Sequence, residues 1–211
     1  MDMKTLSHVP GIKVGMTQVF DSARNVIPVT VIECGQWIIT QIKTVENDGY
    51  NALQIGKLRK RYQGDAFTSE MLEKKSDYFL FIREVRCQST QGYELGATVS
   101  LDDVLFEEAM VVSVTGTSTG RGFQGVVKRL GYTGGPATHG SMFGRRPGAI
   151  GNMRTQGEVI KGKGLPGHMG AETVTIRGLR IVKVDRERGV LLVSGAVPGR
   201  KNSLLYVSKQ G

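Results

Sequence analysis

The chain has 211 residues and a formal charge of +9, and 39% of its residues are hydrophobic. That apolar fraction can build a core, which excludes disorder along the whole chain. Two cysteines, Cys34 and Cys87, exclude a multi-disulfide framework and indicate reduced thiols. No apolar run reaches the ~18 residues of a membrane helix, and residues 1–11 show no secretory signal. A soluble, basic, cytosolic protein is expected.

Short strands are predicted along most of the chain, because β-branched residues recur between turn signals. Pro28 indicates an edge or a strand start, and the Asp48-Gly49 turn predicts a hairpin. The spacing favours a β-barrel or sandwich. The predicted strands cover residues 26–33, 37–45, 50–55, 78–86, 110–115, 173–176, 180–185, 190–194 and 204–207.

One helical stretch, residues 68–75, interrupts the strands. Ser69 is its predicted N-cap, Glu70 lies in the first turn, and lysines lie in the last. A helix this short must be stabilised by packing on the body. It is therefore interpreted as a small insert at about 65–77.

The segment from Gly116 to Gly170 concentrates both charge and glycine. It holds 16 of the 29 glycines, and Glu158 is its only acid. It lacks apolar periodicity, so it is either disordered alone or ordered by a partner of negative charge. The alternative is a solvated basic surface. Its eight cations are Arg121, Lys128, Arg129, Arg145, Arg146, Arg154, Lys161 and Lys163.

Motifs that resemble enzyme sites occur in this segment but lack their context. GRGFQG at 120–125 fits G-x-G-x-x-G, yet the stretch after it breaks at Gly131, Gly134, Gly135 and Pro136, and the first downstream acid is Glu158. GEVIKGKG at 157–164 lacks the final Ser/Thr of a phosphate-binding P-loop. His8, His139 and His168 lack the spacing of a zinc site, and RNA contact is preferred for the last two. We expect no enzyme, cofactor or metal.

A series of motifs spans residues 11–199 and resembles the large ribosomal subunit protein three family, in its bacterial or organellar form. Together they are far more specific than any one of them. In order they are GIKVGMTQVF (11–20), KT (43–44) with DGY (48–50), GTSTGRGFQG (116–125), KR (128–129), THGS (138–141), PGAIG (147–151), KGK (161–163), HMG (168–170) and GAVPG (195–199).

The resemblance implies a mainly β protein: a six-stranded translation-protein-type β-barrel with a small helical insert and a long Gly-rich basic extension. Residues 1–116 and 171–211 would form the body, and 117–170 an extended RNA-binding loop. It further implies a structural role without enzymatic activity, direct binding to large-subunit ribosomal RNA, early action in assembly, and a loop reaching toward the peptidyl-transferase centre.

The implied partners are ribosomal RNA and neighbouring large-subunit proteins, with no membrane and no small-molecule substrate. The location is a cytoplasmic ribosome, with an organellar one as the alternative. A free RNA-binding assembly factor and a nucleotide-using enzyme are the rival functions. The candidate rRNA-binding residues are Lys13, Arg121, Lys128, Arg129, His139, Arg145, Arg146, Gly148, Asn152, Met153, Arg154, Lys161, Lys163 and His168.

One position departs from the family pattern. In several bacterial relatives, a glutamine three residues after the Ile-Gly at the loop tip is N-methylated. Counting from Gly151, that position is Arg154, while Gln156 lies two residues further on. Arginine can fork onto a phosphate or stack on a base, so we expect changed local contacts at the tip and an unchanged overall mode.

Overall fold

The computed structural model describes residues 6–65, 67–99, 101–104, 106–152 and 157–210. The chain divides into two compact units, Met1–Thr117 with Thr173–Gly211 and Ser118–Glu172. Strands dominate the larger unit, and the prediction of a mainly β protein is confirmed.

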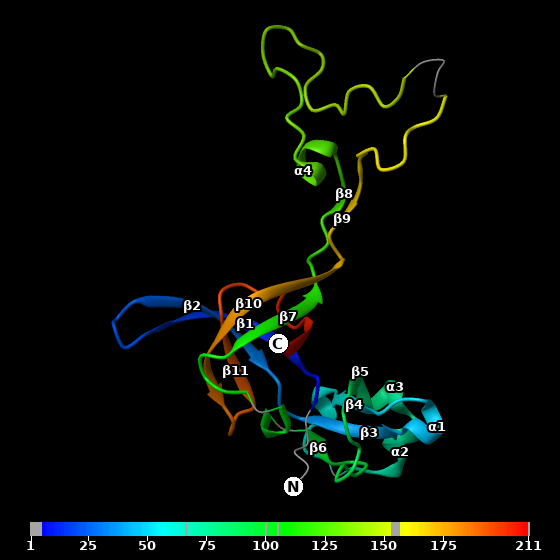
Figure 1. Ribbon diagram of the computed structural model, residues 1–211, viewed down its shortest axis with the longest axis vertical. Coiled ribbons are helices and arrows are strands. Elements are labelled where there is room, and N and C mark those ends of the chain that lie inside the picture. The colour runs from blue at the N-terminus through cyan, green and yellow to red at the C-terminus, as the bar shows by residue number, and fades with distance from the viewer. Residues whose placement is uncertain (1–5, 66, 100, 105, 153–156, 211) are drawn as a thin grey trace. The chain divides into compact units, whose positions relative to one another are not determined.

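Six strands of the larger unit close into an antiparallel barrel (Figure 1). Around the barrel their order is β1-β12-β7-β10-β11-β2, so the C-terminal strand β12 lies between β1 and β7. The barrel strands are β1 (His8–Phe20), β2 (Val26–Glu33), β7 (Val111–Thr117), β10 (Thr173–Asp185), β11 (Val190–Ser194) and β12 (Leu204–Lys209).

Two barrel strands differ from their prediction. β1 was not predicted as a strand, because Pro10, Gly11 and Gly15 interrupt its apolar residues. β10 was predicted as two strands, and the structure makes it one. Its register shifts between Ile176 and Leu179, where Gly178 adopts φ +75°. Glycine readily adopts this left-handed conformation, and it interrupts the apolar alternation of the sequence. The sequence therefore indicates two strands where the structure has one irregular strand.

A second, four-stranded antiparallel sheet has the order β5-β4-β3-β6. The strands predicted at 37–45, 50–55 and 78–86 belong to this sheet and not to the barrel. Its strands are β3 (Trp37–Lys43), β4 (Ala52–Leu58), β5 (Phe79–Arg86) and β6 (Thr98–Val99). One apolar core joins this sheet to the barrel, with Trp37, Ile39 and Leu53 packed in the same cluster as Val114 and Leu205.

Helices accompany the second sheet. The predicted insert is two short helices, α2 (Ser69–Glu73) and α3 (Lys75–Tyr78), and Met71 is buried as packing on the body requires. Thr68, not Ser69, occupies the N-cap position, with extended backbone angles. The β3–β4 hairpin contains the helical turn α1 (Val45–Asp48), which ends at Gly49. Two 3-10 turns, η1 (Lys60–Tyr62) and η2 (Leu101–Val104), complete this unit.

Both cysteines are free thiols. Cys34 is buried and Cys87 is partly buried. Burial raises the pKa of the Cys34 thiol to about 12 and also raises that of Cys87. Among the described residues, no helix is long and apolar enough to cross a membrane. In the same part of the chain, no group of three or more His, Cys, Asp or Glu side chains could hold a metal ion.

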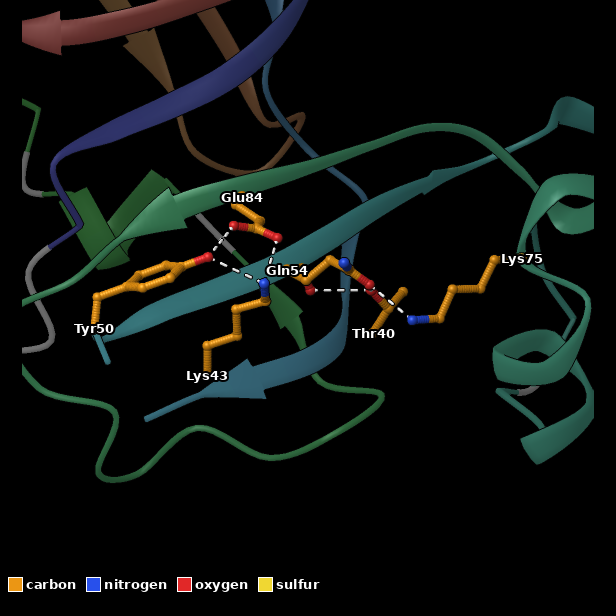
Figure 2. A network of polar contacts seen from close by, with 6 residues as sticks. All are labelled: Thr40, Lys43, Tyr50, Gln54, Lys75 and Glu84. Atoms are coloured by element: carbon orange, nitrogen blue, oxygen red, sulfur yellow. Dashed lines mark hydrogen bonds and ion pairs between the residues drawn. The ribbon is translucent and has the colours of Figure 1, made fainter. Parts of the chain in front are cut away.

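A polar network ties the strands of the second sheet together (Figure 2). Lys43 Nζ lies 2.8 Å from Glu84 Oε1 and donates to the Tyr50 hydroxyl at 3.0 Å, and that hydroxyl donates to Glu84 Oε2 at 2.8 Å. Lys75 from α3 donates to Gln54 Oε1 at 2.7 Å. The KT and DGY motifs thus meet in space, which gives them a structural role in this sheet.

Replacing Glu84 by glutamine should lower the melting temperature slightly, by at most about 3 °C, because the pair is partly exposed. The hydrogen bond from Lys43 lowers the pKa of Glu84. The carboxylate therefore stabilises the fold above the ordinary glutamate pKa, and this contribution is lost as the pH falls through the lowered value. The melting temperatures of the parent and of Glu84→Gln should converge as the pH is lowered from 7 to 3. The exposed Glu46→Gln serves as the control, and a constant difference at all pH values would contradict the assignment.

Candidate nucleic-acid interface

The smaller unit, Ser118–Glu172, begins and ends in a short antiparallel pair. β8 (Gly122–Gln124) pairs with β9 (Gly167–Met169), and Phe123 lies opposite His168. The five-residue helix α4 (Val126–Leu130) follows β8 and ends at Gly131, which has φ +73°. The lack of apolar periodicity predicts a segment without regular elements, and the structure shows that this is wrong at its two ends. Its short strands also supply backbone partners that an isolated loop would lack.

Arg129 fastens α4 to β9 within this unit. Its Nε donates to the His168 carbonyl at 3.1 Å, and its Nη1 donates to the Leu165 carbonyl at 2.7 Å. A Cβ at Gly167 would lie 3.0 Å from Arg129 Nη1, so a larger residue there would require the guanidinium to shift. Arg129 accordingly has a structural role here, although its side chain remains exposed.

The stretch between α4 and β9 is held by a few backbone bonds. Gly135 N donates to Gly144 O at 2.7 Å, and Arg146 N donates to Phe143 O at 3.2 Å. Gly148 follows with φ +81°, a conformation that L side chains rarely adopt, and a Cβ there would lie 3.4 Å from the Phe143 ring. This is a looped backbone with little core of its own.

The remaining cations of this unit point into solvent. All are exposed, and among the residues the structure describes none forms an ion pair. Unpaired cations on a glycine-rich backbone suit a partner that supplies many negative charges. They are Arg121, Lys128, Arg145, Arg146, Lys161 and Lys163.

The other candidates fall into three groups. His139, His168 and Asn152 are exposed in the same unit, and His139 adopts φ +57°. Met153 and Arg154 lie outside the described residues, as does Gln156. Lys13 belongs to the larger unit.

Lys13 is partly buried and already engaged. Its Nζ donates to the carbonyls of Val197 and Gly199, each at 2.9 Å, and desolvation lowers its pKa. The GIKVG and GAVPG motifs therefore meet in the barrel, and the geometry gives Lys13 a structural role there. Two of its three donors are unavailable to RNA.

Exposed aromatic and thioether side chains accompany the cations, and the sequence reasoning missed them. Phe123 is 76% exposed, Met142 82% and Phe143 43%. Aromatic faces stack on unpaired bases of RNA, so aromatic residues interleaved with cations are typical of a nucleic-acid surface. The signal was present in the sequence as phenylalanines in a segment with no apolar periodicity.

Trypsin should cleave the isolated protein first between Arg145 and Arg146 and after Lys161 or Lys163. These bonds lie in the exposed stretch between α4 and β9, whereas Arg129 is tied to two carbonyls. Mass spectrometry of early fragments measures the order. Cleavage at exposed Arg59 or Lys60 of the larger unit at the same rate would contradict it.

An exposed basic surface on a glycine-rich backbone, in a chain that also forms a β-barrel, is typical of RNA-binding proteins. Residues 89–190 match the model of the family described as ribosomal protein L3. The uL3 proteins of the large ribosomal subunit are similar along almost the whole chain. That of Syntrophus aciditrophicus is 43% identical over 94% of this chain and 91% of its own length.

Two further uL3 relatives agree. The protein of Macrococcus caseolyticus is 44% identical, with 93% of each chain covered. That of Listeria welshimeri is 48% identical over 93% of this chain and 94% of its own. The chain belongs to the ribosomal protein L3 family. The family is structural and non-enzymatic, so its members confirm the prediction of a ribosomal protein without catalytic activity.

Proposed function

We propose that this chain is a structural constituent of the large subunit of a cytoplasmic ribosome and that its smaller unit binds large-subunit ribosomal RNA directly. The observation that carries the proposal is the set of exposed cations that form no ion pair among the described residues of Ser118–Glu172. Such a surface binds a polyanion because its Lys and Arg side chains release the counterions condensed around the phosphates. Exposed Phe123 and Phe143 add faces on which bases can stack.

The proposal includes the finer roles that the family resemblance implies. The barrel is of the translation-protein type, and residues 1–116 and 171–211 form the body beside an RNA-binding loop at 117–170. The protein binds early in assembly, and its loop reaches toward the peptidyl-transferase centre. The glycines of the loop support this role, because they permit close approach of backbone to RNA.

Exchanging Arg145 and Arg146 together for glutamine should weaken binding to large-subunit RNA fragments and flatten its salt dependence. Each lost phosphate contact changes the slope of log K against log salt concentration by roughly 0.7–0.9, so we expect a change of about one to two. Filter binding across a salt series measures the slope.

A matched control carries Arg24→Gln and Lys60→Gln, which remove two exposed cations from the larger unit. It changes the net charge equally and should leave the slope almost as steep as in the parent. Equal slopes for both double variants would show that position does not matter and would contradict the assignment. Salt-insensitive binding of the parent would overturn the proposed function itself.

A further inference from the structure

The hairpin of β1 and β2 continues beyond the strands that flank it in the barrel. β12 pairs with β1 only over residues 8–12, while β2 pairs with β1 as far as Phe20. Lys13 makes the last bonds on the outer side of β1, to the backbone of Asn202 and Ser203. Residues 14–20 form what we call the ribbon edge. Within the described part of the chain, its backbone bonds go to β2 alone.

One face of this two-stranded ribbon exposes mostly apolar side chains, with Gln18 as a polar residue among them. Residues directly opposite each other on antiparallel strands share a face. Met16 lies opposite Thr30, Gln18 opposite Pro28, and Phe20 opposite Val26. Met16 is 51% exposed, Phe20 67% and Val26 53%, and Pro28 is exposed beside them. Figure 1 shows the ribbon, in blue, extending beyond the other barrel strands.

The two edges of the ribbon are not equally protected. On β2, Pro28 lacks an amide hydrogen, and proline is a common means of blocking an edge. The ribbon edge on β1, with the sequence VGMTQVF, contains no proline and no charged residue. A long, uncharged, apolar edge readily pairs with another strand unless it is covered.

We propose that the ribbon edge is a docking site for an extended segment of a neighbouring protein of the large subunit, which adds as a strand beside β1 and places apolar side chains on the Met16–Phe20 face. The unpaired backbone N–H and C=O groups of this edge favour a partner in extended conformation, which main-chain hydrogen bonds would hold. RNA is disfavoured because this edge offers no cation to a phosphate. A second copy would bring together two chains of charge +9, which repel each other.

The inference rests on the proposed function, and its test uses the full chain incorporated into large subunits. A benzoylphenylalanine photo-crosslinker replaces Phe20 in one protein and, as the control, the half-exposed Leu80 of β5 in another. Irradiated subunits are then analysed for protein and RNA adducts. We expect a protein adduct from position 20 that maps to one extended segment, with no such adduct from position 80.

A second change tests the apolar face. Met16→Lys places a cation beside the probe and should reduce the yield of the protein adduct about tenfold, the effect of ~1.4 kcal/mol. Val45→Lys, at another exposed apolar position, should leave the yield unchanged. Adducts only to RNA, to a second copy of this chain, or to nothing would each overturn the inference while leaving the proposed function intact. Failure of the parent chain to enter large subunits would overturn the proposed function first.

Discussion

Replacing Glu33 by glutamine is expected to lower the free energy of unfolding by about 2 kcal/mol. Glu33 on β2 accepts a bond of 2.7 Å from Lys57 Nζ on β4, which also donates to the Gly35 carbonyl at 2.8 Å. The Lys57 side chain is 3% exposed, whereas that of Glu33 is 37% exposed. Removing the partner of a fully buried charge costs about 3–5 kcal/mol, and access of water to Glu33 reduces this here.

A double-mutant cycle separates the charge from the packing. Lys57→Met keeps an unbranched apolar chain in the buried position and removes the cation. In that background Glu33→Gln should cost little, because no buried ammonium remains to be neutralised. Urea unfolding of the full chain gives the four free energies. A loss from Glu33→Gln that is equally large with and without Lys57 would contradict the role assigned to the pair.

The strands that the sequence predicted best are those with the simplest environments. The bounds of β2 and β11 agree with the prediction, since both strands are rich in valine, leucine or isoleucine and contain no glycine. β1 was missed because half of it lies in the ribbon, where one-sided burial ends and the apolar period fades. The alternation of apolar residues cannot reveal a strand that is stabilised mainly by pairing with a neighbouring strand.

Contacts between distant residues were also beyond local reasoning. Lys13 was assigned to RNA because it is a cation in a family motif, yet the carbonyls it bonds belong to residues 184 and 186 positions away. Nothing in the spacing of the two motifs shows that β1 and the segment before β12 meet. The closure order of the barrel, with β12 between β1 and β7, is likewise set by long-range packing.

The basic unit was located by composition alone, because a long acid-free stretch needs no structural knowledge to be seen. Its internal order was missed for a different reason. α4 has only five residues between Gly125 and Gly131, too few to show helical periodicity. Arg129 stabilises it through carbonyls near β9, so the helix depends on a contact that is remote in sequence.

Gly148→Asp is expected to impair assembly of the large subunit or to alter the response to drugs that bind the peptidyl-transferase centre, while the larger unit of the isolated protein stays folded. Two effects combine. A carboxylate would lie among phosphates on the proposed RNA path, and a side chain at φ +81° costs of order 1–2 kcal/mol. Subunit profiles and drug sensitivity of cells relying on the variant measure the outcome.

Two matched variants separate these effects. Gly148→Asn tolerates the left-handed conformation and adds similar volume without charge, so it isolates the steric part. Gly151→Asp adds the same charge at a glycine without positive φ, where the nearest atom to a Cβ is Glu158 O at 3.8 Å. If charge dominates, both aspartates should impair assembly and asparagine should have a much weaker effect. If close approach dominates, both changes at Gly148 should be harmful and Gly151→Asp mild. Normal subunit yield, peptide-bond formation and drug response in Gly148→Asp would contradict the proposal that this loop reaches toward the peptidyl-transferase centre.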